Sequence, residues 1–165
     1  MKILVTGIDG MIGHKIAQSL SKEFQVFGST RKKIKSINIG TEKCEIINHD
    51  FIIDNNLGLI DEIDPDIIIN CVGITIRRGL NNSIENTKKL NSDLPHKLNH
   101  WVETNNKKLI HLSSDCVFSG KKGNYSDDSI PDATDLYGIS KSNGEVTGNN
   151  ALTIRCSIVG REIYN

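Results

Sequence analysis

The sequence of 165 residues carries no net charge, because 20 Lys and Arg side chains balance 20 Asp and Glu. A surface that binds nucleic acid through overall positive charge is therefore not expected. No apolar run reaches the roughly 18 residues that a transmembrane helix needs, so we expect no contact with a membrane. The N-terminal run is strand-like and is not followed by a small-residue cleavage site, which argues against a signal peptide and favours a cytoplasmic protein.

The cysteines form no C-x-x-C pair and match no zinc-ligand spacing. Each lies in or beside an apolar run, which is typical of small buried side chains in a reducing compartment. We therefore expect free thiols and no metal site, with a disulfide or a metal role as the alternative. The four cysteines are Cys44, Cys71, Cys116 and Cys156.

Short β-rich runs alternate with amphipathic helical patterns along the whole chain. Strands are expected at residues 2–6, 24–29, 43–48, 66–72, 108–113 and 151–155. Helices are expected at residues 12–22, 55–63, 81–105 and 135–148. Pro95 is expected to kink the longest helix. The alternation predicts an α/β fold, a doubly wound parallel sheet (Rossmann fold) with strand order 3-2-1-4-5-6.

A glycine-rich turn joins the first predicted strand to the first predicted helix. Gly7 can adopt the backbone angles of a tight turn, Gly10 lets the main chain approach a pyrophosphate, and Gly13 allows close packing of helix and strand. The N-terminus of the helix then presents N–H groups and a positive dipole end to the anion. This context predicts a dinucleotide site rather than a plain tight turn. The other turn residues assigned to the cofactor are Asp9, Met11 and Ile12.

The second predicted strand ends in Ser29-Thr30-Arg31-Lys32-Lys33, which contains no acidic residue. An acid about 20 residues after the glycine turn would bind a ribose 2′-hydroxyl, whereas an arginine accepts a 2′-phosphate. We therefore expect NADP(H) to be favoured over NAD(H), with Arg31 holding the phosphate and Thr30 or Ser29 donating a hydroxyl hydrogen bond. The alternative for Lys32 and Lys33 is that both are merely solvated.

Asp50 and Phe51 follow the third predicted strand. Asp50 could accept a hydrogen bond from the adenine amino group, and Phe51 could line the adenine pocket. A plain turn at this position is the alternative.

Tyr137 and Lys141 lie four residues apart on a predicted helix and therefore share one face. A nearby ammonium favours the phenolate, so Lys141 is expected to lower the pKa of Tyr137 and make it a proton donor to a carbonyl. Ser113 and Ser114 lie at the carboxyl end of the fifth predicted strand, where ligands bind in such sheets. The Ser114 hydroxyl could hydrogen-bond a substrate oxygen there. Each signal alone is weak, but together and in this order they favour a reductase.

Four sequence blocks occur in a fixed order: GIDGMIG at 7–13, NCVG at 70–73, SSDCVFSG at 113–120 and YGISK at 137–141. In this order they resemble the extended short-chain dehydrogenase/reductase family, and most closely its dTDP-4-dehydrorhamnose reductase group. The resemblance covers essentially the whole chain. Members of that group reduce the 4-keto group of nucleotide-linked deoxysugars.

The resemblance implies roles for particular residues. Tyr137 falls at the position of the family's acid, Lys141 at that of its partner, and both also contact the cofactor. Ser114 stands where the family has a catalytic Ser or Thr, most often Thr. Asn91 matches an asparagine that supports the proton network, although a plain polar helix residue is the alternative. Cys71, Val72 and Gly73 match the strand end that passes the cofactor ribose.

Three arginines also fall at positions of interest. Arg155 matches a family arginine near the cofactor or substrate edge, and a surface ion pair is equally plausible. Arg77 and Arg78 follow the fourth predicted strand, where a contact with substrate phosphates is one interpretation.

We therefore expect residues 1–165 to form one NAD(P)-binding Rossmann domain that lacks most of the sugar-binding C-terminal part. The expected function is NADPH-dependent reduction of a 4-keto group on a nucleotide-linked deoxysugar, in surface-polysaccharide synthesis of the dTDP-rhamnose kind. An epimerase or dehydratase is disfavoured by the missing acid after the second strand. A non-catalytic or truncated dinucleotide-binding module is the other alternative, because the chain is short. The resemblance also implies a homodimer formed through the two long helices.

Overall fold

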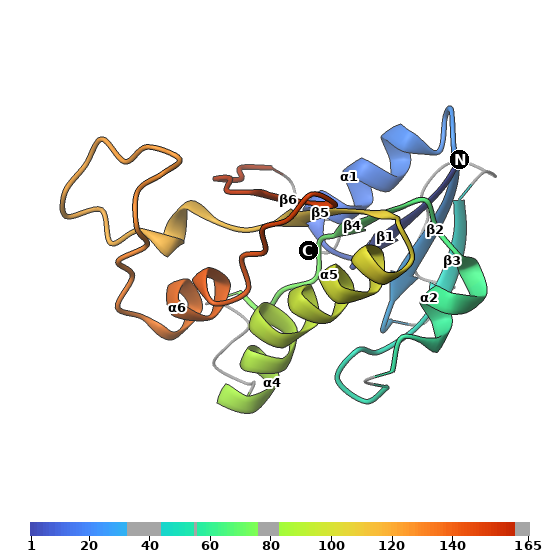
Figure 1. Cartoon of the computed structure of the whole chain (residues 1–165), viewed down its shortest axis with the longest axis horizontal. Helices are drawn as coiled ribbons and strands as arrows, with labels where there is room; N and C mark the ends of the chain where they lie inside the picture. The colour runs from blue at the N-terminus through green and yellow to red at the C-terminus, as the bar shows by residue number, and fades with distance from the viewer. Residues whose placement is uncertain (33–43, 55, 76–82, 161–165) are drawn as a thin grey trace.

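The structure is a computed structural model that describes residues 1–32, 44–54, 56–75 and 83–160. In this part of the chain, parallel strands form one sheet in the order β3-β2-β1-β4-β5-β6 (Figure 1), which confirms the predicted doubly wound fold. The strands are β1 (Lys2–Thr6), β2 (Gln25–Thr30), β3 (Cys44–Asn48), β4 (Ile67–Asn70), β5 (Lys108–Leu112) and β6 (Ala151–Ile154).

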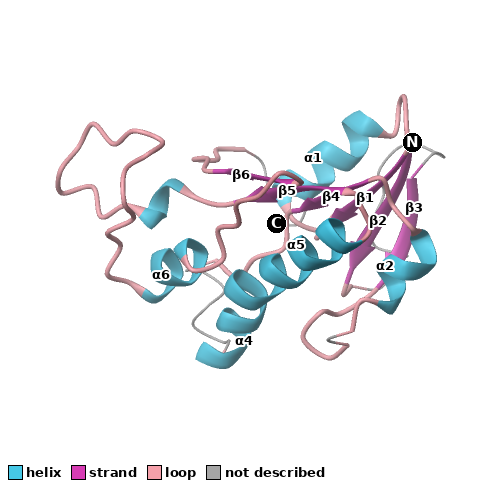
Figure 2. Ribbon diagram, in the orientation of Figure 1, coloured by secondary structure: helices cyan, strands magenta, loops and turns pink. Residues whose placement is uncertain are grey.

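Helices cover both faces of this sheet, as Figure 2 shows. The α-helices of the described residues are α1 (Met11–Leu20), α2 (Gly58–Ile63), α4 (Ile84–Lys88), α5 (Leu94–Thr104) and α6 (Leu136–Ser142), of which α1 lies over one face and α2 and α5 over the other. Alternate residues of β1 face opposite layers, because successive side chains of a strand point to opposite faces. Ile3 and Val5 pack in one cluster with Ala17 of α1. Leu4 packs in the other cluster, with α2 and α5.

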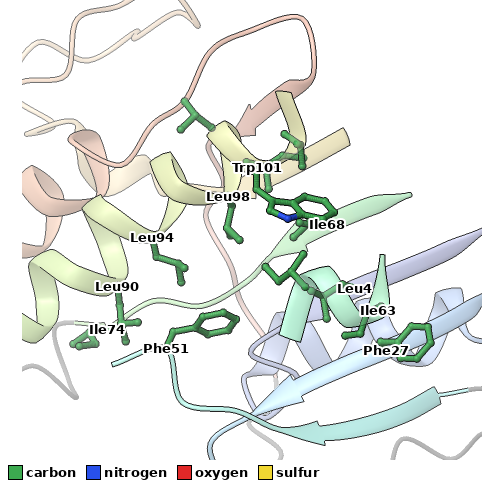
Figure 3. Packing of buried hydrophobic residues seen from close by; sticks show 14 residues of the cluster. Leu4, Phe27, Phe51, Ile63, Ile68, Ile74, Leu90, Leu94, Leu98 and Trp101 are labelled. Carbon is green, nitrogen blue, oxygen red and sulfur yellow. The ribbon is translucent and has the colours of Figure 1, made fainter. Parts of the chain in front are cut away.

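The larger core lies between the sheet and α5 (Figure 3). Leu98 and Trp101 of α5 pack in the same buried cluster as Leu4 of β1 and Ile68 of β4. The indole N–H of Trp101 donates to Asp61 Oδ1 at 2.7 Å, which links α5 to α2. The buried indole thus has its donor satisfied while its rings fill the core.

The long helix predicted at 81–105 is divided in the structure. A π-helical turn at Lys89–Asp93 separates α4 from α5, and the N–H of Leu94 donates to the carbonyl of Lys89, five residues earlier. The cause is Pro95, which has no N–H for the carbonyl of Asn91, and whose ring would collide with that carbonyl in a regular α-helix. The wider turn therefore takes the place of the expected kink. Residues 81 and 82 lie outside the described residues.

Helix α6 ends at Ser142, six residues before the predicted end at 148. It begins at Leu136 and is capped by Asp135, whose carboxylate accepts the N–H of Gly138 at 3.0 Å. Beyond Ser142 the chain turns at Gly144, which packs directly on the backbone of Asn91. A contact that close requires a residue without a Cβ, so the helix ends where the chain meets the π-helical turn.

A buried polar network connects three neighbouring strands near their carboxyl ends. Thr6 Oγ1 donates to Asn70 Oδ1 at 2.8 Å, and Asn70 Oδ1 also accepts the N–H of Val72 at 3.2 Å. Asn70 Nδ2 then donates to His111 Nδ1 at 3.1 Å. His111 is fully buried, and burial is the main cause that lowers its pKa to about 3, with Lys141 adding to the effect. The folded protein therefore holds a neutral imidazole at this position.

This burial makes folding stability sensitive to pH. Between about pH 6.5 and pH 3 the unfolded chain binds a proton at His111 that the folded protein does not, so stability falls as the pH falls. From pH 7 to pH 5 we expect His111 to contribute a loss of about 2 kcal/mol. Urea unfolding of His111→Asn at both pH values should show a correspondingly smaller loss. His100→Asn, which removes an exposed histidine of α5, is the matched control and should keep the loss seen in the parent chain.

Candidate active site

Two adjoining cavities lie at the carboxyl ends of the strands. The first runs from the glycine turn over the ends of β2 and β3, and the second, of about 520 Å³, extends from the glycine turn over the ends of β4 and β5 to α6. Both are lined by Gly10, Cys71, Val72 and Gly73. The residues that the sequence assigns to a cofactor therefore form one continuous site at the sheet edge where ligands bind in this fold.

The glycine turn has the tight geometry that its sequence predicts. Gly7 has φ +70°, and its N–H donates to the carbonyl of Ser29 at 2.9 Å. A Cβ on Gly13 would lie 2.4 Å from the carbonyl oxygen of Gly7, so only glycine lets α1 start this close to β1. A Cβ on Gly10 would instead meet a single protein atom, at 3.3 Å, because Gly10 borders the cavities. The turn therefore fits a phosphate group that approaches the main chain at the start of α1.

The first cavity brings together the residues assigned to the adenosine end of the cofactor. It is lined by Asp9, Thr30, Arg31, Asp50 and Phe51, among others. Asp50 Oδ1 accepts the N–H of Ile52 at 2.9 Å, so its side chain also forms part of a turn. Phe51 is buried in the larger core. Both residues thus have a structural contact in addition to their place beside the cavity.

The end of β2 carries an ion pair as well as Arg31. The Lys32 ammonium lies 3.6 Å from Asp9 Oδ2, so the alternative that Lys32 is merely solvated does not hold, and the backbone N–H of Lys32 donates to Thr30 Oγ1 at 3.1 Å. Arg31 lines the cavity. His49 lines it as well and was missed by the sequence analysis, although it directly follows β3 and so lies at the same sheet edge.

The second cavity brings Ser114, Tyr137 and Lys141 together. Ser114 precedes a short 3₁₀ turn at Asp115–Val117, where its Oγ accepts the N–H of Cys116 at 3.1 Å and donates to Asp115 Oδ1 at 3.2 Å. The Ser114 side chain also acts on the Tyr137 phenol, whose pKa it lowers. A hydroxyl and a phenol therefore converge at one end of the cavity.

The protonation of Tyr137 differs from the sequence expectation. Burial raises the pKa of the phenol, and the nearby Ser114 side chain opposes that rise. The expected lowering by Lys141 is wrong for this structure, because burial dominates the pKa of the phenol; the Lys141 ammonium itself donates to the carbonyl of Leu112 at 2.6 Å. Burial lowers the pKa of Lys141 itself to about 8. At neutral pH the site therefore holds a protonated phenol beside a charged lysine.

Asn91 lines neither cavity and is completely buried. Its Oδ1 accepts the N–H of Ile74 at 2.8 Å, and its Nδ2 donates to the Ile74 carbonyl and to Ser140 Oγ, each at 3.0 Å. These hydrogen bonds connect the segment after β4 to α6, the helix that carries Tyr137 and Lys141. This geometry assigns Asn91 a positioning contact, and its expected part in a proton network stays a prediction.

Arg155 forms an ion pair rather than lining the site. Its Nη2 lies 2.7 Å from Glu145 Oε2, and it borders neither cavity. Of the two interpretations left open by the sequence, the ion pair is therefore the one that the structure supports. Arg77 and Arg78 lie outside the described residues.

The chain after β6 contributes residues that the sequence analysis missed. Cys156, Ser157 and Ile158 line the second cavity, and the Ser157 hydroxyl donates a short hydrogen bond to Asp115 Oδ2. Their position directly after a predicted strand could have identified them, because every segment that leaves a parallel sheet at its carboxyl edge can reach the ligand site. Thr75 was missed in the same way after β4.

All four cysteines are free and partly buried. Burial raises the pKa of Cys71 to about 12 and that of Cys44 to about 11, so both are thiols at neutral pH. Among the described residues, no group of three or more His, Cys, Asp or Glu side chains is placed to hold a metal ion. In the same part of the chain, none of the helices combines the length and the apolar character needed to cross a bilayer.

Fold and site together define a dinucleotide-binding domain of the short-chain dehydrogenase/reductase type. Comparison with known sequences agrees: the chain belongs to the family described as RmlD substrate binding domain, which matches residues 1–161. This is the dTDP-4-dehydrorhamnose reductase-like group of extended, NAD(P)-dependent members.

Two curated relatives show how far the similarity extends. The chain is 28% identical over 165 residues to the "Probable low-salt glycan biosynthesis reductase Agl14" of Haloferax volcanii, covering 96% of this chain and 54% of that protein. It is also 28% identical over 175 residues to methionine adenosyltransferase 2 subunit beta of Pongo abelii, covering 98% and 48%. The chain thus spans about half the length of the curated relatives it matches.

Solved structures with the same fold are also matched over about half of their length. A hypothetical dTDP-4-dehydrorhamnose reductase from Sulfolobus tokodaii superposes with a TM-score of 0.80 at 27% identity, covering 94% of this chain and 55% of that one. The UDP-glucuronic acid 4-epimerase from Bacillus cereus in complex with NAD has a TM-score of 0.72 at 26% identity, covering 87% and 50%.

Proposed function

We propose that the protein carries out NADPH-dependent reduction of the 4-keto group of a nucleotide-linked deoxysugar, as part of polysaccharide synthesis. The observation that carries the proposal is the convergence of Ser114, Tyr137 and Lys141 on a cavity that continues into the glycine turn. A proton donor, a hydroxyl and a cation are the groups that a carbonyl needs when it is converted to an alcohol.

The glycine turn and the residues after β4 would hold the nicotinamide cofactor, which would supply the hydride for the keto carbon. Tyr137 donates a proton to the keto oxygen, for which its raised pKa keeps the phenol protonated at neutral pH. The Ser114 hydroxyl orients the same oxygen. Lys141, held by the carbonyl of Leu112, would bind the cofactor in the same cavity.

The test mixes the purified chain with NADPH and a dTDP-linked 4-keto-6-deoxysugar and follows NADPH absorbance. A substrate-dependent fall in absorbance supports the proposal, and tight NADPH binding without any turnover opposes it. The second outcome would favour a dinucleotide-binding module. That alternative is favoured by the similarity to methionine adenosyltransferase 2 subunit beta.

Arg31 is proposed to select NADP(H). Arg31→Ala should weaken NADPH binding by about 10- to 100-fold, because charge-assisted hydrogen bonds to the 2′-phosphate are lost. NADH binding should change by no more than about twofold, since its ribose carries no phosphate. Calorimetric titration with each cofactor measures the ratio of the NADPH affinity to the NADH affinity. Lys121→Ala is the control, because it removes an exposed cation that lines neither cavity. An unchanged ratio in Arg31→Ala would show that the preference arises elsewhere.

The structure describes a single chain, so the expected homodimer stays a prediction. The same holds for a cytoplasmic location and for the extent of the domain. An epimerase on the same scaffold stays disfavoured, because the end of β2 presents Arg31 and no acid to the first cavity.

A further inference from the structure

Asp9 of the glycine turn has no part in the mechanism above, although it lines the first cavity. The turn is attached to the end of β2, because the N–H groups of Gly7 and Ile8 both donate to the carbonyl of Ser29, at 2.9 and 3.1 Å. Gly10 closes the turn by donating its N–H to the carbonyl of Gly7 at 3.0 Å. Asp9 is therefore held beside the end of β2.

The Asp9 carboxylate forms an ion pair with a lysine that follows β2. Its Oδ2 lies 3.6 Å from the Lys32 ammonium. The backbone of Lys32 is fixed, since its N–H donates to Thr30 Oγ1 at 3.1 Å and its carbonyl accepts Asn48 Nδ2 at 2.9 Å. The Asp9 side chain is only 13% exposed, against 38% for Lys32. Water and salt therefore screen the Asp9 charge less than they screen a surface charge.

The end of the second strand is the place where a dinucleotide-binding sheet distinguishes its cofactors. An acid there accepts a hydrogen bond from the 2′-hydroxyl of NAD(H), whereas a basic side chain accommodates the 2′-phosphate of NADP(H). Strand β2 carries no acid and is followed by Arg31. The fold nevertheless brings Asp9 into the same cavity from the glycine turn. The first cavity thus contains one group of each kind, a carboxylate and a guanidinium.

His49 and Asp50 also line the first cavity, and each has a contact in the turn after β3. His49 Nδ1 lies 3.9 Å from Asp54 Oδ2, and Asp50 Oδ1 accepts the N–H of Ile52 at 2.9 Å. Asp9 is therefore the acid whose charge is set from the end of β2.

An uncompensated Asp9 carboxylate would oppose a 2′-phosphate and favour a 2′-hydroxyl. Like charges repel strongly where water is limited, and an ionised carboxylate accepts hydrogen bonds only. The Lys32 ammonium changes this balance, because its positive charge lies against the same carboxylate. Lys32 itself does not line the cavity, so its effect on a ligand there is exerted through Asp9.

We propose that Asp9 and Lys32 together determine the specificity for the 2′ substituent of the cofactor: the Lys32 ammonium neutralises the Asp9 carboxylate and thereby lets Arg31 bind a 2′-phosphate. The inference deepens the proposed function and rests on its preference for NADP(H). It adds that the preference depends on a pair of charges contributed by two elements. The same cavity without the lysine charge would favour NAD(H).

The two members of the pair should shift the cofactor preference in opposite directions. Lys32→Met should weaken NADPH binding by about 10-fold and leave NADH binding no weaker than in the parent chain, because the freed carboxylate repels the phosphate and accepts from the hydroxyl. Asp9→Asn should strengthen NADPH binding by about threefold and weaken NADH binding by a similar factor. A merely structural contact would change the affinity for both cofactors equally and leave their ratio unmoved.

The experiment is a double-mutant cycle on the dissociation constants of NADPH and NADH, measured by calorimetric titration of the full chain. If Lys32 acts through Asp9, Lys32→Met should weaken NADPH binding by less than about twofold in the Asp9→Asn background. Equal losses in both backgrounds, or an unmoved ratio of the two affinities in the single variants, overturn the proposal. Asp9→Asn is almost isosteric, so its opposite effects on the two cofactors decide if Lys32→Met does not fold. Lys15→Met is the matched control, because it removes an exposed cation of α1 that lines neither cavity.

Two smaller probes separate this inference from the proposed reaction. Adenosine 2′,5′-bisphosphate and AMP differ in the 2′-phosphate and carry no nicotinamide, so the same cycle can be measured with them. Their ratio should move in the same two directions as the ratio of NADPH to NADH affinity. If the parent chain reduces no keto sugar, the proposed reaction fails, while the binding cycle still decides whether the pair sets the specificity.

Discussion

Replacing Tyr137 by Phe should reduce the turnover of the keto sugar by about 100- to 10,000-fold. The variant removes the proton that neutralises the keto oxygen but retains the ring, which lines the second cavity. The affinity for NADPH should change by no more than a few-fold, because the glycine turn and the first cavity are untouched. Steady-state kinetics together with a cofactor titration measure the two quantities separately.

Tyr125→Phe is the matched control, because it deletes the phenolic hydroxyl of a tyrosine that lines neither cavity. That hydroxyl contacts Asp132 at 3.2 Å in the loop before α6. The control should retain most of the activity. Normal turnover by Tyr137→Phe would mean that another group supplies the proton, and equal losses in both variants would indicate general damage to the fold.

Gly144→Ala should lower the free energy of unfolding by about 3 kcal/mol, because overpacked sites commonly cost this much when backbone must move. A methyl group there would lie 1.9 Å from the carbonyl oxygen of Asn91 and 2.9 Å from its carbonyl carbon. Both atoms belong to the π-helical turn and cannot rotate away as a side-chain end could. The variant should also disturb the contacts between Asn91 and Ser140, and hence the position of α6.

Chemical unfolding in urea measures this loss. Asn143→Ala is the control, since it adds no atom at a buried contact and replaces an exposed side chain one residue earlier. It should change stability by no more than about 0.5 kcal/mol. A Gly144→Ala protein as stable as the control would show that the backbone contact can relax at little cost.

Local sequence signals predicted most of the fold. The β-rich runs and helical patterns led to the observed strand order. Each strand or helix is indicated by the periodicity of a short segment, and β-α-β units connect parallel strands with one preferred handedness. The predicted cofactor residues all line one of the two cavities, and all except Tyr137 and Lys141 of α6 lie at the carboxyl end of a strand or in the glycine turn. Errors were concentrated at helix ends. Pro95 acts locally on the turn that contains Asn91, whereas Gly144 meets the Asn91 backbone from 53 residues further along the chain.

The sequence by itself determined which residues stand at the ligand-binding edge of the sheet, since position after a strand is a local property. Only the tertiary structure decided what those residues do to one another. It placed Asn91 in a buried contact, gave Arg155 a carboxylate partner and raised the pKa of Tyr137 instead of lowering it. These outcomes depend on burial and on partners distant in sequence, such as Ser140, 49 residues from Asn91. Desolvation and long-range pairing arise only when the chain is packed, so no local pattern encodes them.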